Sequence, residues 1–206
     1  MRLYKGIGTA LAGAIALVFA ATSAPAQQAI DATAALQERS IGSPDAPVTV
    51  IEYFSLTCPH CASFHNDIYG DLKQKYVDTG KVRFVYKEFP RDGVDLRPGM
   101  MARCADPRRY AGLVQVLFKN QPNWTRSSDP VGELAKIGRL AGIDDATFQS
   151  CLASEELANG LLAERQNASA LGVQSTPTFA IDGQLYPGSR SIEEFSEIID
   201  PLLANN

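Results

Sequence analysis

The chain has 206 residues, with 19 Lys and Arg against 23 Asp and Glu and a formal net charge of −4. This length accommodates one domain, with room for an insertion, and it is sufficient to bury a sizeable core. The acidic balance argues against nucleic acid as a partner, because phosphate backbones are bound by basic surfaces.

Residues 1–26 have the pattern of a cleavable secretory signal. Residues 1–5 are basic, residues 6–20 are apolar and uncharged, and an Ala-Pro-Ala triplet ends at Ala26. The apolar run is too short for a comfortable membrane span, although an uncleaved N-terminal anchor is the alternative. We expect a soluble mature protein in an oxidising space outside the cytoplasm. The Ala- and Gln-rich residues 27–41 predict a flexible lead-in or a frayed helix.

A pair of cysteines follows the first predicted strand. Turn residues at 42–47 lead into an apolar strand at 48–54, and Cys58-Pro59-His60-Cys61 opens a helix predicted over 59–76. A cysteine at the start of a helix faces unpaired backbone N–H groups and the positive end of the macrodipole, and both lower its pKa. This pattern predicts an exposed, reactive first sulfur and a thiol–disulfide exchange centre. An inert disulfide or half of a metal site is the alternative.

The remaining elements form a helical block between strands. Residues 82–86 alternate apolar and polar and predict a second strand, and residues 92–171 have helical periodicity for four or five short helices. Candidate N-caps in this block are Asp129, Asp144 and Ser154.

Strand signals return near the C-terminus. Residues 177–181 and 184–186 predict a hairpin through Asp182-Gly183. Ser191 and the acid three residues later form a capping box for a final helix ending near residue 203.

The chain has four cysteines. In a secreted protein an even number favours disulfides. Because Cys58 and Cys61 are prone to exchange, we pair Cys104 with Cys151 as a structural disulfide within the helical block. Two separate buried thiols, or a regulatory disulfide, are the alternatives.

Three segments together resemble the DsbA family of bacterial periplasmic thiol–disulfide oxidoreductases. They are Gly-Ser-Pro-Asp-Ala-Pro with its strand at 42–55, the Cys58-Pro59-His60-Cys61 motif, and Gly-Val-Gln-Ser-Thr-Pro-Thr-Phe at 172–179. The last segment resembles the cis-proline loop of that family. Its Thr176 departs from the valine of the best-known oxidase and is a residue that disulfide isomerases often carry.

The resemblance implies an α/β, thioredoxin-like fold with an inserted α-helical domain. Residues 42–91 and 172–206 would form the two halves of the thioredoxin-like domain, and residues 92–171 the insertion. The implied activity is that of a thiol:disulfide oxidoreductase, a protein dithiol oxidase that donates its disulfide to unfolded secreted proteins with free cysteines. A DsbB-type membrane partner would reoxidise it. No cofactor or metal is needed, and the short lead-in favours a monomer.

The expected site consists of the cysteine motif and the cis-proline loop. Cys58 is the predicted nucleophile and Cys61 the resolving thiol, with Pro59 and His60 tuning the pair. In the cis-proline loop, Pro177 would present the backbone of Thr176 for strand-like pairing with substrate.

Glu52 is the predicted buried acid beneath these sulfurs. It would exchange the proton of Cys61, with Lys87 as its expected partner, although an acid at a strand edge facing water is the alternative. We expect His65 to be a surface or helix-packing residue.

Other functions remain open on the sequence. A disulfide isomerase or reductase on the same fold is the nearest alternative to the oxidase. Two further alternatives are a copper or zinc carrier, which would use Cys58, Cys61 and His60, and an inactive binding module.

Overall fold

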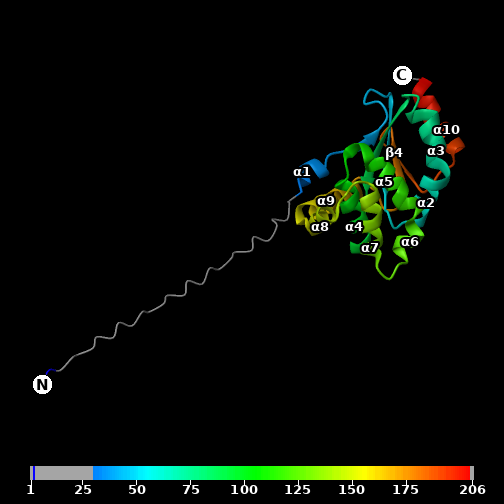
Figure 1. Cartoon of the computed structure of the whole chain (residues 1–206). Helices are drawn as coiled ribbons and strands as arrows, with labels where there is room; N and C mark the ends of the chain where they lie inside the picture. The colour runs from blue at the N-terminus through cyan, green and yellow to red at the C-terminus, as the bar shows by residue number, and fades with distance from the viewer. Residues whose placement is uncertain (1, 3–29, 205–206) are drawn as a thin grey trace.

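The computed structural model describes residue 2 and residues 30–204, so almost all of the predicted signal lies outside the described residues. Five strands and twelve helical segments make up the regular structure of the described part (Figure 1). The strands are β1 Arg39–Ile41, β2 Val48–Phe54, β3 Val82–Glu88, β4 Thr178–Ile181 and β5 Gln184–Pro187. The helical segments are α1 Ala32–Ala35, α2 Pro59–Ser63, η1 Phe64–Ile68, α3 Tyr69–Leu72, η2 Lys73–Val77, α4 Gly93–Arg103, α5 Pro107–Lys119, α6 Gln121–Thr125, α7 Pro130–Leu140, α8 Asp145–Ala153, α9 Glu155–Ala170 and α10 Ile192–Ala204. Within residues 30–204, no helix is both long and apolar enough to cross a membrane.

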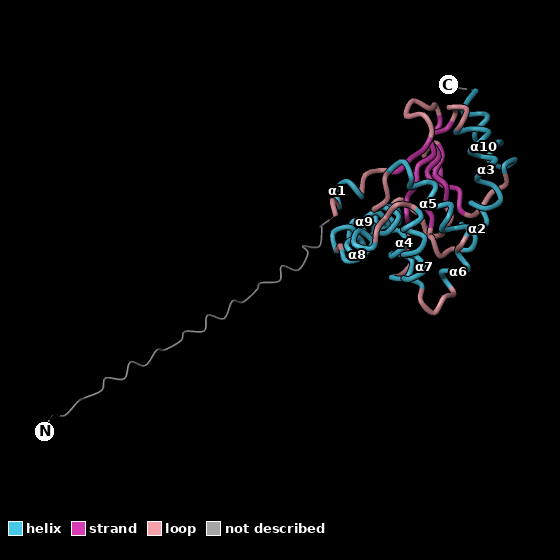
Figure 2. Tube along the Cα trace, in the orientation of Figure 1, coloured by secondary structure: helices cyan, strands magenta, loops and turns pink. Residues whose placement is uncertain are grey.

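The strands form one mixed sheet in the order β1-β3-β2-β4-β5, visible as the central magenta strands in Figure 2. β2 pairs in parallel with β3, while β1 with β3, β2 with β4 and β4 with β5 pair antiparallel. The parallel pair is connected by the helical segment from α2 to η2, and the helical block joins β3 to β4. The predicted α/β architecture with an inserted helical block is confirmed.

The N-terminal lead-in differs from the prediction. Asp31 caps α1 by accepting a hydrogen bond from the N–H of Ala34, and β1 then forms an edge of the sheet, with Ser40 opposite Val85. This lead-in therefore contains a short helix and an edge strand within residues 30–41, where the sequence predicted a flexible lead-in or a frayed helix. Its strand is only three residues long, which is too short for the alternating pattern that predicts strands.

The helix that carries the cysteine pair runs from Pro59 to Val77, close to its predicted span, but two of its turns are π-helical. The first, η1, begins three residues after Cys61. Wide turns of this kind occur often at functional sites and have no simple sequence signature.

The helical block contains six helices, more than the four or five predicted, because the five-residue α6 follows α5 almost directly. All three predicted N-caps form. Asp129, Asp144 and Ser154 accept hydrogen bonds from backbone N–H groups in the first turns of α7, α8 and α9.

The C-terminal hairpin and helix form as predicted. Asp182 and Gly183 both have positive φ angles, 48° and 74°, as a two-residue hairpin turn requires. In the capping box, the N–H of Ser191 donates to Glu194, and the N–H of Glu194 donates to the hydroxyl of Ser191.

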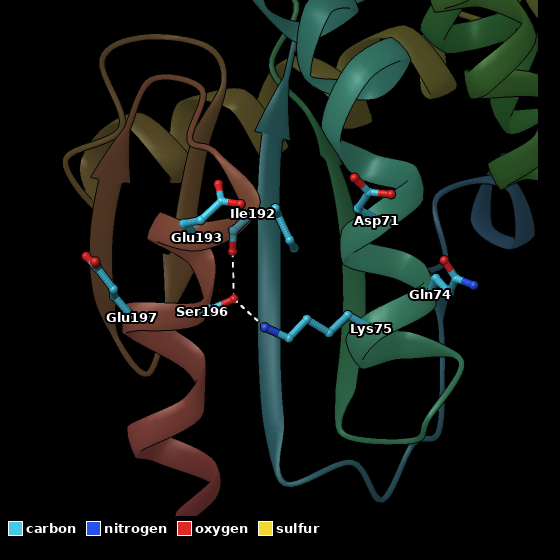
Figure 3. Close-up of a pocket in the computed structure, with 7 residues that line it drawn as sticks. All are labelled: Asp71, Gln74, Lys75, Ile192, Glu193, Ser196 and Glu197. Atoms are coloured by element: carbon cyan, nitrogen blue, oxygen red, sulfur yellow. Dashed lines mark hydrogen bonds between the residues drawn. The ribbon is translucent and has the colours of Figure 1, made fainter.

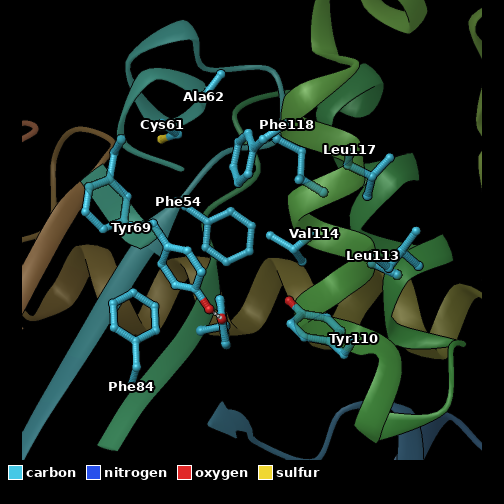
Figure 4. Packing of buried hydrophobic residues seen from close by; sticks show 14 of the residues in the cluster. Phe54, Cys61, Ala62, Tyr69, Phe84, Tyr110, Leu113, Val114, Leu117 and Phe118 are labelled. Atoms are coloured by element: carbon cyan, nitrogen blue, oxygen red, sulfur yellow. Dashed lines mark hydrogen bonds between the residues drawn. The ribbon is translucent and has the colours of Figure 1, made fainter. Parts of the chain in front are cut away.

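Strand β2 supplies two hydrophobic cores because alternate side chains point to opposite faces of the sheet. Val50 and Phe54 enter the main core, which contains the helix after Cys58 and one side of α5 (Figure 4). Tyr53 faces the other way and packs with Phe89 and with Ala168 of α9. The central strand is thus covered on both sides.

The end of α4 is a junction of several segments. Arg103 is buried there, and its Nε donates to Glu88 at the end of β3 over 2.6 Å. Another guanidinium nitrogen donates to the carbonyl of Gln37 over 2.8 Å, and the hydroxyl of Tyr110 donates to Glu88 over 2.7 Å. Burial opposes ionisation of Glu88, but Arg103 reverses that effect and lowers the pKa of this carboxyl.

The next residue, Cys104, is joined by a disulfide to Cys151 of α8. The two cysteines are 47 residues apart, and their Cα atoms are separated by 6.4 Å. The disulfide therefore holds the end of α4 against α8.

Replacing Cys104 and Cys151 together by serine should lower the free energy of unfolding by about 4 kcal/mol, because the unfolded chain regains the entropy of an open loop. For a protein of this size, that corresponds to a fall in Tm of roughly 10 °C. Thermal and urea unfolding measure the change. Both proteins should first be treated with glutathione so that Cys58 and Cys61 are reduced in each. Equal stabilities would show that the disulfide does not restrain the chain.

Candidate active site

The local structure presents the cysteines just after the end of β2, the central strand of the sheet. β2 ends at Phe54, and the N–H of Cys58 donates to the carbonyl of Ser55 across the turn that follows. Cys58 has extended backbone angles and is the N-cap of α2, and Pro59 occupies the first helical position. A proline is well tolerated there because its missing N–H would have no partner within the helix.

The sulfur of Cys58 is held in a polar cradle. It lies 3.3 Å from the carbonyl oxygen of Thr176. The surroundings of Cys58 lower the pKa of its thiol to about 5. The largest cause is the hydrogen bond from the Cys61 thiol, and burial acts in the opposite direction. The Thr176 side chain and the N–H groups of Cys61 and His60 lower the pKa further. The low pKa agrees with the sequence analysis, but the neighbouring thiol contributes more than the helix N–H groups do.

The prediction that Cys58 is exposed is wrong, since only 4% of the residue is accessible. The cis-proline loop lies against its sulfur and α6 against its backbone, and neither contact is visible in the local sequence. Pro59 and His60 are the exposed residues of the motif.

Cys61 lies one turn further along the helix and is fully buried. Burial raises the pKa of its thiol, and the hydrogen bond to Cys58 and the charge of Glu52 raise it further. The two sulfurs are both free thiols in this structure. Their pKa values are displaced in opposite directions, which is the arrangement expected of one attacking and one protected sulfur.

Glu52 is buried beneath the pair, but its partner is not the one predicted. Its Oε2 lies 2.8 Å from Nε2 of His65. The Nζ of Lys87 instead lies 3.6 Å from Oε1 of Glu164 on α9. In the parallel register, Lys87 is opposite Tyr53, and Glu52 is opposite Tyr86, so Lys87 and Glu52 point to opposite faces of the sheet.

His65 is not a surface residue. Both it and Glu52 have no exposed side-chain area. Its position four residues after Cys61 places the two side chains on the same face of the helix, and this spacing is the signal that could have identified it.

The peptide bond between Thr176 and Pro177 is cis, as the loop resemblance implied. Pro177 is buried and directly precedes β4, while Thr176 is partly exposed beside Cys58. This geometry places a backbone carbonyl next to the sulfur, where an extended peptide could also approach.

The helical block supplies two residues that sequence reasoning missed. Asp95 of α4 accepts the N–H of Thr57 over 3.1 Å. Gln121 of α6 donates from one nitrogen to the carbonyls of Leu56 and Cys58 over 2.8 and 3.0 Å. Both side chains are buried. They clamp the turn before the helix, and nothing in their sequence neighbourhood indicates this role.

A separate open groove lies between the α3–η2 segment and α10 (Figure 3). Lys75 donates to Ser196 across it over 2.7 Å, with Asp71, Glu193 and Glu197 nearby. Asp71 is 13 residues beyond Cys58, or about 20 Å along a helix. The groove therefore lies away from the thiols. Among the residues that the structure describes, no three His, Cys, Asp or Glu side chains gather as a metal site.

Comparisons with known proteins agree with this fold. The family model described as Thioredoxin matches residues 34–201. A Rickettsia felis relative, named as a protein-disulfide oxidoreductase, is 34% identical over 165 residues, which cover 79% of this chain and 59% of that protein. The chain spans less than two thirds of the length of its Rickettsia relatives.

Two solved structures are similar throughout most of their length. The α-DsbA1 of Wolbachia pipientis is 28% identical with a TM-score of 0.76, covering 82% of this chain and 92% of that one. A protein-disulfide isomerase of Novosphingobium aromaticivorans is 28% identical with a TM-score of 0.69, covering 80% and 97%.

The sheet, its inserted helices and the paired thiols define a thioredoxin-fold protein with a helical insertion. The chain belongs to the Thioredoxin family whose model it matches, and its architecture is similar to that of DsbA proteins.

The thiolate of Cys58 should titrate near pH 5, and its alkylation should slow as the pH falls through that value. Replacing Cys61 by alanine removes the largest stabilising contact and should raise the pKa of Cys58 by about one unit, equivalent to about 1.4 kcal/mol. Absorbance at 240 nm measures the thiolate. Ser63→Ala, at an exposed position of the same helix, is the matched control. A Cys61→Ala profile that overlays the parent would contradict the assignment.

Proposed function

We propose that this protein is a periplasmic dithiol oxidase that donates a Cys58–Cys61 disulfide to unfolded secreted proteins. The observation that carries the proposal is the pair of free thiols at the start of α2, with the sulfur of Cys58 3.3 Å from the carbonyl oxygen of Thr176. These surroundings lower the pKa of Cys58 to about 5, beside a thiol whose pKa is raised. A stabilised thiolate stabilises the reduced form, so the disulfide form readily accepts electrons. The secretory pattern of residues 1–26 supports the location.

The exchange begins with attack of a substrate thiolate on the sulfur of Cys58. The bond between the two enzyme sulfurs breaks, its electron pair goes to the sulfur of Cys61, and that sulfur takes up a proton. A second substrate thiolate then attacks the substrate sulfur of the mixed disulfide, and Cys58 leaves as a stable thiolate. The substrate loses two electrons and the enzyme gains two.

The contacts around the pair support a division of roles. Cys58 is the nucleophile, Cys61 resolves, and Pro59 and His60 shape the start of the helix. Thr176 and Pro177 present a backbone carbonyl to an extended substrate segment. Glu52 exchanges the proton of Cys61. A DsbB-type membrane protein would restore the disulfide, and the protein would act as a monomer without a cofactor.

A disulfide isomerase or reductase is the second candidate. Two observations favour it: the threonine at position 176, and the similarity to a structure named as a protein-disulfide isomerase. The chemistry at the sulfurs is the same in both cases. The reduction potential and the redox state in the cell distinguish them.

The oxidised protein should convert reduced, unfolded ribonuclease A to disulfide-bonded forms faster than it reactivates scrambled ribonuclease A. Glutathione equilibration should give a potential nearer to the DsbA value of about −120 mV than to the value of about −270 mV for thioredoxin. Cys58→Ser should abolish both activities, whereas Cys104→Ser with Cys151→Ser should retain them. A strongly reducing potential with dominant isomerisation would favour the second candidate.

Glu52→Gln should slow the step in which Cys61 loses its proton, because the buried thiol no longer has an acceptor. When the reduced protein is oxidised by saturating glutathione disulfide, the limiting rate should fall at least about tenfold at pH 7. Asp67→Asn removes one negative charge from an exposed position of the helical segment that carries Cys61 and should leave the rate unchanged. Equal rates for Glu52→Gln and the parent would remove Glu52 from the mechanism.

A further inference from the structure

A chain of three polar side chains lies beneath Cys61. Glu52 and His65 have no exposed side-chain area, and Oε2 of Glu52 is 2.8 Å from Nε2 of His65. The other ring nitrogen, Nδ1, is 2.7 Å from Nε2 of Gln115 on α5. Gln115 is partly exposed, so the chain runs from the core to the edge of the helical block.

The direction of these hydrogen bonds follows from the groups involved. An amide nitrogen can only donate, so Nδ1 of His65 accepts. The proton of the neutral ring is therefore on Nε2, which donates to Oε2 of Glu52. Gln115 thus selects the tautomer that His65 presents to the carboxylate.

The other carboxylate oxygen has no such partner. Oε1 of Glu52 is buried and makes no hydrogen bond within the described residues. A buried acceptor without a partner is destabilising, and its presence in a core calls for an explanation. The charge of Glu52 acts on the thiol of Cys61 and on the phenols of Tyr69 and Tyr86. Of these three groups, Cys61 is the one that exchanges its proton in the proposed reaction.

The ring of His65 is held firmly. Phe118 stacks on it with centroids 4.3 Å apart and planes at 18°, and Tyr69 lies on it at 5.0 Å and 30°. Phe54 meets its edge at 6.2 Å. Figure 4 shows Phe118, Phe54 and Tyr69 close to Cys61 in this part of the core. Rotation of the ring away from Glu52 would require these aromatic contacts to be broken.

We propose that His65, oriented by Gln115, is a positioning residue that occupies Oε2 of Glu52 and thereby directs Oε1 to the proton of Cys61. The inference deepens the proposed function, since it presupposes that Glu52 exchanges this proton. In the resolving step, the Cys61 proton passes to Oε1, the sulfur of Cys61 bonds to the sulfur of Cys58, and the thiolate bound to Cys58 leaves.

The groups that could also titrate here are few. Cys61 is on the same helical segment as His65, and Glu52 faces His65 from β2. Tyr69, which lies on the ring of His65, is hydrogen bonded to Tyr86. Burial raises the pKa of Tyr69 to about 12 and that of Tyr86 well above its usual value. From α5, the contacts are Gln115 and Phe118, which do not titrate. Neither phenol therefore loses its proton between pH 5 and 9, and a pH profile over that range is not affected by the two tyrosines.

Two substitutions of His65 separate positioning from packing. His65→Phe keeps an aromatic ring against Phe118 but removes the donor. His65→Gln removes the ring but keeps an amide donor that can reach Glu52. The probe is glutathione disulfide, which reacts without any protein substrate, so the result does not depend on which proteins the enzyme oxidises. The only tryptophan, Trp124, is buried in α6 one turn after the clamp residue Gln121 and provides a fluorescence signal.

At low glutathione disulfide, the rate reports attack by Cys58 and should be the same in all variants. At saturation it reports attack by Cys61, and His65→Phe should lower that limiting rate about tenfold and alter its dependence on pH. His65→Gln should restore the rate to within about twofold of the parent.

The double variant Glu52→Gln with His65→Phe should be no slower than Glu52→Gln alone, because the two residues act as one unit. The inference is overturned if His65→Phe keeps the limiting rate and pH profile of the parent, or if its effect is fully additive with Glu52→Gln. If His65→Phe does not fold, Gln115→Leu, which removes only the donor to Nδ1, must slow the limiting rate for the inference to stand. Failure of the proposed oxidase function would appear separately, in the ribonuclease assay.

Discussion

The pairing of β2 between β3 and β4 is the constraint on which the site depends. Hydrogen bonds on both edges fix its register, and the register decides which side chains face the helix that carries the thiols. A slip of one residue would exchange Glu52 with Tyr53. The carboxylate would then lie in the core beside α9, and a phenol would lie under Cys61. The same strand ends where Cys58 must begin the helix, so one ladder sets both the position of the sulfurs and the identity of the group beneath them.

Around this strand, several polar side chains within the core are held by hydrogen bonds. Glu88 is satisfied by Arg103 and Tyr110, and Asp95 and Gln121 are satisfied by the backbone of the turn before α2. These contacts make the helical insertion part of the active site. It does not simply cover the sheet, because its side chains hold the main chain on both sides of Thr57. The thiolate of Cys58 is therefore stabilised within a frame supplied by segments far apart in the sequence.

The elements with strong local signals could be predicted from the sequence. Asp129 and Ser191 are residues that favour the N-cap position, so each indicates the start of a helix. Asp182-Gly183 is one of the few residue pairs that favour a two-residue hairpin turn. The spacing of Cys58 and Cys61 at the start of a helix likewise predicts a thiol–disulfide exchange centre. Partners that depend on register or on distant contacts could not be predicted. Lys87 and Glu52 are complementary in charge, but they point to opposite faces of the sheet. Gln121 reaches the turn across 63 residues of sequence, and no local pattern encodes that approach.

The separation of Cys104 from Cys151 also has a consequence for the order of biosynthesis. A chain that emerges from its N-terminus exposes Cys58, Cys61 and Cys104 before their last companion appears, so three thiols exist while the correct partner of one of them is still absent. Pairing neighbours as they emerge could leave Cys104 bonded to the wrong sulfur. The buried contacts of Arg103 with Glu88 and Gln37 involve only residues already made at that stage. They can hold the adjacent cysteine in place until α8 arrives, so that native pairing follows from folding and does not have to precede it.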